Sequence, residues 1–169
     1  MKQEEYEAAA LYWEQKEAAG VKMEQEELVE EIQKFILSHN TCALATGSDT
    51  FIRCTPIEYS WNDGAFWMFS EGGLKFKALK TNLQVSLAIF DNFEGFGKLK
   101  GLQVSGKALL IDPDTEEYEQ AARFRKIPVE ALRRMVHQMY LIKVVPQHFD
   151  YLSSDMKERG YDVRQPMDF

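Results

Sequence analysis

One short stretch of the chain combines the groups that bind a phosphate. Residues 70–82 read SEGGLKFKALKTN, so a hydroxyl, two glycines and three lysines stand where strand-like sequence ends and helix-like sequence begins. If a helix starts near Gly73, its first unpaired N–H groups favour an anion, to which Ser70 and Lys75 can also donate. The alternative is an ordinary helix with Leu74, Ala78 and Leu79 facing the core and with Lys75, Lys77 and Lys80 in solvent. Because a lone Gly-Gly-x-Lys is a weak signal, the spacing leaves both interpretations open.

A second candidate lies in residues 51–61, which read FIRCTPIEYSW. Alternation along a strand places Arg53 on one face with aromatic and β-branched neighbours, among them Thr55. Such an arginine needs an anionic or carbonyl partner, which is either a ligand or a carboxylate at the rim of a barrel. Pro56 cannot donate to a strand ladder, so it marks an edge, a bulge or a place where a flat ligand meets the backbone.

Other catalytic patterns are absent from the sequence. His39, His137 and His148 lie far apart and have no evident partner. Cys42 and Cys54 have no further Cys or His at metal-ligand spacing, so neither a disulfide framework nor a metal site is expected, and both are expected to be buried in strands. No Gly-x-Ser-x-Gly motif or Cys-His arrangement suggests hydrolysis. Any chemistry is therefore expected to come from a cofactor.

The spacing of apolar residues predicts the elements that hold these groups. Residues 2–38 are expected to form two helices broken near Gly20, the second with an apolar stripe. Asp63-Gly64 predicts a tight turn that pairs the strands on either side of it antiparallel. Six strands are expected in all, at 42–49, 51–61, 65–71, 84–91, 99–111 and 140–152. Small antiparallel sheets of this size usually curl or close, which predicts a mainly β fold with a six-stranded barrel.

Two details of this pattern concern polar groups. In the strand at 99–111, Leu102 and Val104 face the core while Gln103 and Ser105 face the other side, which is free for polar contacts. Asp114 followed three residues later by Glu117 predicts a capping box that opens a helix. The expected organisation is a helical N-terminal extension at 1–38, a barrel domain at 39–153 and a polar, irregular tail at 154–169.

Charge and composition restrict the partners. The 169 residues carry 27 acidic and 20 basic side chains, which argues against a general nucleic-acid binder. Residues 1–40 supply most of the formal charge of −7, whereas residues 70–110 hold six lysines against three acids and form the locally basic region. No apolar run approaches the roughly 20 residues that span a bilayer, and the N-terminus is not a secretory signal. A cytoplasmic protein without a membrane partner is therefore expected.

The order of these segments resembles a known family. ATGSDTFIRCTPIEYSWNDGAFWMFSEGGLKFKALKTNLQVSLAIFD followed by KLKGLQVSGKALLID is similar to the pyridoxamine 5′-phosphate oxidase-like family, the FMN-binding split barrels. The resemblance covers residues 35–112 well and extends loosely to about Tyr151. It implies a six-stranded antiparallel split β-barrel that forms a homodimer with FMN at the subunit interface.

The resemblance also implies the residues that hold FMN. Arg53 and Lys75 would contact the phosphate, assisted by Ser70 and the residues near Gly73, while the segment from Cys54 to Pro56 would lie along the flavin ring. Gln103 and Ser105 would supply polar contacts from the long strand. The full set of expected FMN-binding residues is Arg53, Cys54, Thr55, Pro56, Met68, Phe69, Ser70, Gly73, Leu74, Lys75, Gln103 and Ser105.

Three departures from the oxidases limit what the resemblance implies. Glu58 stands where the oxidases often have a lysine, and Leu74 stands where they have a second basic residue beside the phosphate lysine. The C-terminal segment also lacks their Arg-x-His pattern, so pyridoxamine phosphate is not expected as the substrate. In this segment, Tyr161 and Arg164 are candidates to fold back over the flavin.

Two functions remain open at this point. The first is an FMN-dependent oxidoreductase that passes hydride or electrons to an unidentified small acceptor, with NAD(P)H as a candidate donor. The second is a non-catalytic module on the same barrel that holds or stores FMN, heme or another cofactor without turnover.

Overall fold

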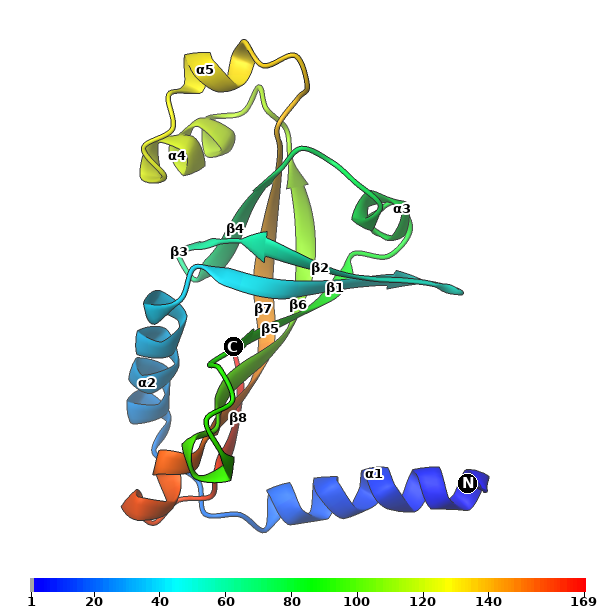
Figure 1. Ribbon diagram of the computed structural model, residues 1–169, viewed down its shortest axis with the longest axis vertical. Helices are drawn as coiled ribbons and strands as arrows, with labels where there is room; N and C mark the ends of the chain where they lie inside the picture. Colours follow the sequence, from blue (N-terminus) through cyan, green and yellow to red (C-terminus); the bar gives the residue numbers. More distant parts are fainter. Residues whose placement is uncertain (1) are drawn as a thin grey trace.

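The computed structural model describes residues 2–169, which form one antiparallel sheet with helices at its ends and on one face (Figure 1). The helices are α1 (Gln3–Ala18), α2 (Gln25–Ser38), α3 (Lys75–Leu79), α4 (Glu116–Phe124) and α5 (Val129–Arg133), with 3-10 turns η1 (Phe96–Lys98) and η2 (Ser154–Arg159). The strands are β1 (Thr41–Ser48), β2 (Phe51–Glu58), β3 (Ser60–Asn62), β4 (Ala65–Ser70), β5 (Gln84–Phe90), β6 (Lys100–Ile111), β7 (Tyr140–Ser153) and β8 (Arg164–Asp168).

The sheet is strongly curled and has the order β2-β1-β5-β6-β7-β4-β3, with β8 also paired to β7. The long strands β6 and β7 form its spine, and a bulge between Ser105 and Gly106 bends their ladder. Between β3 and β4, Asp63 (φ 50°) and Gly64 (φ 68°) form the expected two-residue turn. The predicted fold class, a mainly β antiparallel split barrel with N-terminal helices, is confirmed.

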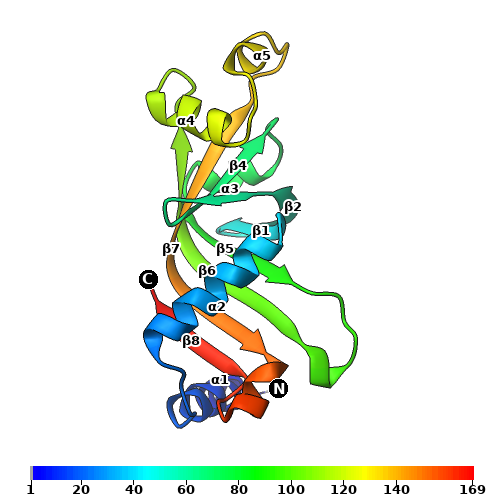
Figure 2. The same ribbon diagram turned by 90° about the vertical axis from the view of Figure 1, so that its left-hand side faces the viewer.

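The core lies between α2 and the inner face of the sheet. Helix α2 crosses the sheet diagonally (Figure 2) and buries Leu28, Ile32, Phe35 and Ile36 against apolar side chains from β1, β5, β6 and β7. These helix residues recur every three or four positions, as the sequence predicted. Each such side chain contributes roughly 1.5–3 kcal/mol when it leaves water, so α2 is an integral part of the domain.

The opposite, outer face of the sheet carries small and polar side chains. The register of adjacent strands places Pro56, Ala43, Ala88, Gln103 and Asp150 in one row across β2, β1, β5, β6 and β7. A second row runs parallel to it through Cys54, Ala45, Ser86, Ser105 and His148. No helix of residues 2–169 covers this face, which lies on the right in Figure 1 between the β1–β2 hairpin and α1.

Two expectations about the strands need correction. The strand expected at 51–61 divides at Tyr59, so β2 pairs with β1 while only β3 pairs with β4 across the Asp63-Gly64 turn. The C-terminal segment is not irregular, because it forms η2 and then β8. The sheet therefore has eight strands where six were expected. Pro166 is tolerated in β8 because this strand pairs on one side only.

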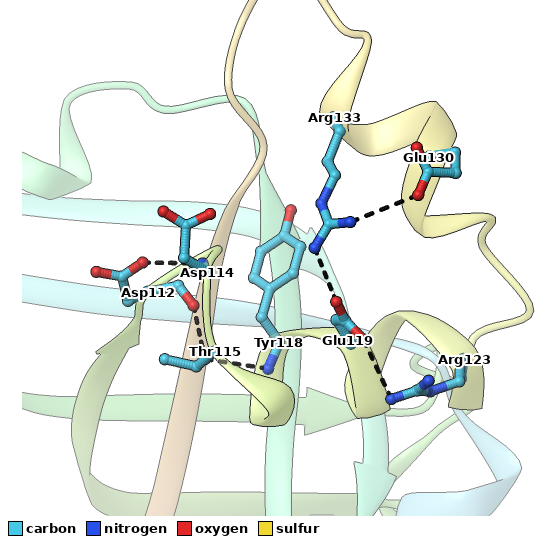
Figure 3. A network of polar contacts seen from close by, with 8 residues as sticks. All are labelled: Asp112, Asp114, Thr115, Tyr118, Glu119, Arg123, Glu130 and Arg133. Atoms are coloured by element: carbon cyan, nitrogen blue, oxygen red, sulfur yellow. Dashed lines mark hydrogen bonds and ion pairs between the residues drawn. The ribbon is translucent and has the colours of Figure 1, made fainter.

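Helices α4 and α5 form a small cap at the end of β6 and β7 (Figure 1). Thr115, and not the expected Asp114, caps α4, because its hydroxyl accepts from Tyr118 N at 3.4 Å (Figure 3). Arg133 of α5 lies 2.7 Å from Glu119 of α4, and the Tyr118 hydroxyl donates to the carbonyl of Met139. These contacts hold the cap over a second apolar cluster that includes Trp67.

Within residues 2–169, no helix is long and apolar enough to cross a membrane.

Candidate anion and cofactor site

Lys75 is the unusual residue of the predicted phosphate stretch. Its side chain is only 6% exposed, whereas the neighbouring Leu74 is 46% exposed. Burial lowers the pKa of the Lys75 ammonium group. No carboxylate among residues 2–169 forms an ion pair with it, and its Nζ donates to the carbonyl of Gly72 at 2.5 Å. The interpretation of Lys75 as part of a solvated face is therefore wrong, and a buried cation remains without a counter-ion.

The loop before Lys75 is held open by its glycines. Gly72 and Gly73 have φ values of 117° and 105°, which side chains rarely adopt. The Ser70 hydroxyl accepts from Gly72 N at 3.2 Å and donates to Gly72 O at 3.1 Å, so it closes the loop on itself. Helix α3 begins at Lys75 and has five residues, so its dipole adds little. The positive charge of this loop therefore comes from the lysine.

Arg53 belongs to β2, a strand that packs against the helix after this loop. Helix α3 packs against β1 and β2, and the Lys77 Nζ lies 5.9 Å from the ring centroid of Phe51. Arg53 stands two residues after Phe51 in β2, so both side chains are on the same face of the strand that α3 packs against. Arg53 is exposed, and the structure shows no ion pair or hydrogen bond from its side chain to another of the residues 2–169. The alternative of a salt bridge at the barrel rim is thus not found.

Sequence reasoning missed Thr46 in the same neighbourhood. This residue of β1 is opposite Arg53 in the ladder, it is 2% exposed, and its hydroxyl has no hydrogen-bond partner within the described chain. A buried unpaired hydroxyl usually costs stability, so such groups are rare away from functional sites. Its position inside an apolar alternation with Cys42 and Leu44 hid it from sequence analysis.

The remaining expected flavin contacts lie on the outer face of the sheet. Cys54 and Pro56 project opposite to Arg53 and Thr55, on the side that also carries Gln103. Within the part of the chain that the structure describes, β2 pairs with β1 alone, so its second backbone edge has no strand partner there. A flat ligand could therefore lie along this edge and reach both faces.

Two adjacent cavities open on the outer face. One, of about 510 Å³, is lined by Pro56, Ala43, Ala88 and Phe90. The other, of about 250 Å³, also includes Ala88 and Phe90 and is lined by Gln103 and Arg164. Pro56 and Gln103 were both expected to contact the flavin and belong to different strands, β2 and β6. They border the region that these two cavities form together. Ser105 follows on the same face and is exposed.

Met68 and Phe69 are placed differently. The Met68 side chain is fully buried in the main core, and the Phe69 ring packs against Tyr118 at a centroid distance of 5.6 Å. Neither side chain is free for a ligand, so any contact at these positions comes from the backbone.

The charge of Glu58 is balanced by a residue from another part of the chain. Its carboxylate lies 2.7 Å from Arg125 Nη2, and Arg125 Nη1 also donates to Tyr59 O at 3.4 Å. Arg125, which follows α4, therefore neutralises the carboxylate at this position. The partners are 67 positions apart, and no local pattern connects them.

The cysteines and histidines differ from expectation. Cys42 is buried, which raises the pKa of its thiol to about 12, but Cys54 is exposed, contrary to prediction, because it faces the uncovered side of β2. His148 does have partners: its Nδ1 lies 2.7 Å from Asp168, and its Nε2 lies 3.4 Å from Asp150. No group of three acidic, Cys or His residues that could hold a metal ion occurs in residues 2–169.

Tyr161 and Arg164, the residues of the C-terminal segment that were candidates to fold back over the flavin, lie on different sides of the sheet. Tyr161 packs against the main core, while the Arg164 guanidinium lies 5.1 Å from the ring centroid of Trp13 in α1. Arg164 lines the smaller cavity with Gln103, so it can reach a ligand on the outer face. Tyr161 is half-buried on the other side.

The curled antiparallel sheet, the helix on its inner face and the basic loop at its edge define a split-barrel protein. The family model described as pyridoxamine 5′-phosphate oxidase matches residues 28–153. The chain therefore belongs to this family, as the sequence resemblance indicated. No curated protein matches the sequence.

Solved structures share the fold at low identity. An FAD-binding protein from Mesorhizobium loti is 17% identical, with a TM-score of 0.57 over 72% of this chain and 89% of that one. ChuZ from Campylobacter jejuni is 16% identical, with a TM-score of 0.66 over 87% of this chain and 61% of that one. HutZ, described as a heme storage protein from Vibrio cholerae, is 20% identical, with a TM-score of 0.57 over 70% of this chain and 89% of that one.

Proposed function

We propose that the protein binds FMN and transfers hydride or electrons between the reduced flavin and a small acceptor. The observation that carries the proposal is the buried Lys75 ammonium group, which has no counter-ion among residues 2–169. Lys75 begins α3, and this helix packs against β2, the strand of Arg53. A phosphate would supply the missing negative charge and accept from both side chains.

The residues present fit this group. Lys75 and Arg53 would hold the phosphate, and the Ser70–Gly73 loop would close around it. The backbone from Cys54 to Pro56 is the free edge along which the ring would lie. Gln103 and Ser105 lie on the outer face of β6, beyond β1 and β5, so they would offer polar contacts away from this edge. When bound, FMN would supply hydride chemistry at its N5. The chain itself binds the cofactor, orients it and shields part of it from water.

We further propose a homodimer with FMN at the subunit interface. The outer face is uncovered and bears two shallow cavities, which a second copy of the chain would close. Its central side chains, such as Ala43, Ala45, Ser86 and Ala88, are small enough for close approach of another backbone. NAD(P)H is the proposed electron donor.

FMN titration tests the proposal directly. The purified protein is expected to show a flavin absorbance band or, after refolding without cofactor, to quench FMN fluorescence at micromolar FMN. If neither preparation binds FMN in this range, the proposed function is wrong.

The second candidate is a storage or carrier module that holds FMN or heme without turnover. Its support is the exposed Leu74, which leaves the phosphate site with fewer basic groups than the oxidases have, together with the fold shared with HutZ. NAD(P)H consumption with quinones or nitro compounds separates the two candidates. A bound flavin that no pyridine nucleotide reduces would support the carrier, and a heme Soret band without flavin binding would support heme storage.

A further inference from the structure

Helix α1 makes almost no contact with the rest of its own chain. None of the 16 residues from Gln3 to Ala18 is buried. Its large apolar side chains are each at least 50% exposed, namely Tyr6, Leu11, Tyr12 and Trp13. Helices in proteins gain most of their stability from packing of one face, which α1 lacks within this chain. The helix also lies outside residues 28–153, so the family fold does not account for it.

The direction of α1 is nevertheless fixed by its C-terminal connection. Val21 N donates to Asp162 at 2.6 Å, and Met23 N donates to the buried Gln165 at 2.9 Å. At Gly20, an added Cβ would lie 2.6 Å from the Asp162 carboxylate, so a side chain here would displace the carboxylate that accepts from Val21 N. Arg164 stacks on Trp13. The segment after β7 therefore anchors the base of α1 and holds the helix away from the body.

Helix α1 projects to the same side as the outer face of the sheet. In Figure 1 it extends to the right at one end of that face, and the β1–β2 hairpin with α3 extends to the right at the other end. A second copy that covered the outer face would lie between these two projections. Each projection would then reach past the interface to the partner.

The two projections have opposite charge. Helix α1 holds five glutamates and one lysine, and no ion pair involves them within residues 2–169. At the other end, Lys77 of α3 and Lys80 directly after it are exposed and form no ion pair within residues 2–169. The acidic residues of this region are Asp49, Glu71 and Glu58, and Glu58 is paired with Arg125. Ile52, 79% exposed, and Leu74 supply apolar surface beside these lysines for the aromatic residues of α1.

The twofold axis of such a dimer lies in the plane of the interface, and two limiting directions of this axis differ in what α1 meets. One brings the two acidic α1 helices together, and the other sets each α1 beside the β1–β2 hairpin and α3 of the partner. Like charges disfavour the first arrangement, while opposite charges favour the second. We infer that α1 is an arm that packs against the β1–β2 hairpin and α3 of a second copy of the chain. The inference rests on the dimer of the proposed function. It adds how the two copies are oriented and which contact they make outside the sheet.

Charge reversal in full-length chains tests the arm. One variant carries Glu4→Lys and Glu7→Lys in α1, and the other carries Lys77→Glu and Lys80→Glu in α3. Each alone is expected to raise the dimer dissociation constant about tenfold at low salt, measured by sedimentation equilibrium. Glu116→Lys with Glu158→Lys makes the same charge change as the α1 variant at exposed positions elsewhere, and it is expected to leave the dissociation constant within about twofold.

Mixing the two reversed chains shows whether the contact is between copies. In a mixed dimer, the lysines of one α1 face the glutamates of the other chain's α3, and the second arm retains its native pair. Mixed dimers are therefore expected to exceed the half that random pairing gives, as measured by native mass spectrometry. The inference would be overturned if the two reversed chains paired at random, or if the control variant had a dimer dissociation constant as high as the reversed variants.

The same samples separate this inference from the proposed function. FMN titration of the wild type reports the cofactor site, because none of the residues proposed to hold FMN lies in α1. A wild-type dimer that binds FMN but is insensitive to the reversals contradicts only the arm. A chain that is monomeric at all concentrations contradicts both the arm and the proposed dimer, and loss of FMN binding in the wild type contradicts the cofactor site alone.

Discussion

The Lys75 ammonium group lies 2.5 Å from the carbonyl oxygen of Gly72, and this carbonyl is the one hydrogen-bond acceptor that the structure gives it within residues 2–169. The carbonyl is a weak substitute for a counter-ion, because it carries only a partial charge. Removal from water therefore lowers the pKa of Lys75. An anion beside this group would restore its ordinary pKa and gain free energy in doing so.

Lys75→Ala is expected to weaken FMN binding by about 1.5–3 kcal/mol, or about 10- to 150-fold in Kd, because it removes a charge-assisted hydrogen bond to the phosphate. Lys77→Ala, two residues further along α3 and exposed, is the matched control and is expected to change Kd by less than about threefold. Fluorescence titration measures both. Equal losses in the two variants would contradict the assignment of Lys75.

Thr46→Val is expected to raise the free energy of unfolding of the cofactor-free protein by about 1 kcal/mol. Valine has nearly the same shape, and the buried hydroxyl that it removes has no partner in the described chain. Urea unfolding measures the change, with Thr55→Val on the half-buried face of β2 as the control. A less stable Thr46→Val variant would mean that a water or ligand pairs with the hydroxyl.

The Glu58–Arg125 ion pair is expected to contribute modestly to the free energy of unfolding. Both side chains are partly exposed, at 56% and 26%, so solvent screens their attraction. A double-mutant cycle with Glu58→Gln and Arg125→Met is expected to give a coupling of about 0.2–1 kcal/mol that shrinks at high salt. Coupling above about 2 kcal/mol would show that this pair is a structural link between α4 and β2.

Several features of the fold were predictable because they depend on neighbouring residues. The Asp63-Gly64 turn requires positive φ at both positions, and the residue types that accept it stand there in the sequence. The stripe of α2 likewise follows from spacing alone. The division of one expected strand at Tyr59 was not predictable, because it depends on which partners β2 and β3 find across the sheet.

The site was predictable only in part. Spacing could not decide between Lys75 in solvent and Lys75 as a ligand group, since the two interpretations differ in burial and not in residue type. The family resemblance favoured Lys75, and burial with no counter-ion now supports that choice. Arg125, Thr46 and the carboxylates beside His148 were missed, because each relationship joins residues that are distant in the sequence or hidden in an apolar pattern.

The pH dependence of stability is expected to reflect His148. The Asp168 carboxylate, with help from Asp150, raises the pKa of His148 above its ordinary value of 6.5. A group whose pKa is higher in the folded protein stabilises the fold below the unfolded pKa and loses this contribution as the pH rises through the folded pKa. The urea midpoint of the wild type is therefore expected to fall between about pH 6 and about pH 8 by more than that of His148→Gln. The difference is expected to be small, since Asp168 is almost fully exposed. Asp168→Asn, which keeps the side-chain shape, is expected to lower the His148 pKa measured by NMR titration, and an unchanged pKa would mean that this carboxylate is not its main partner.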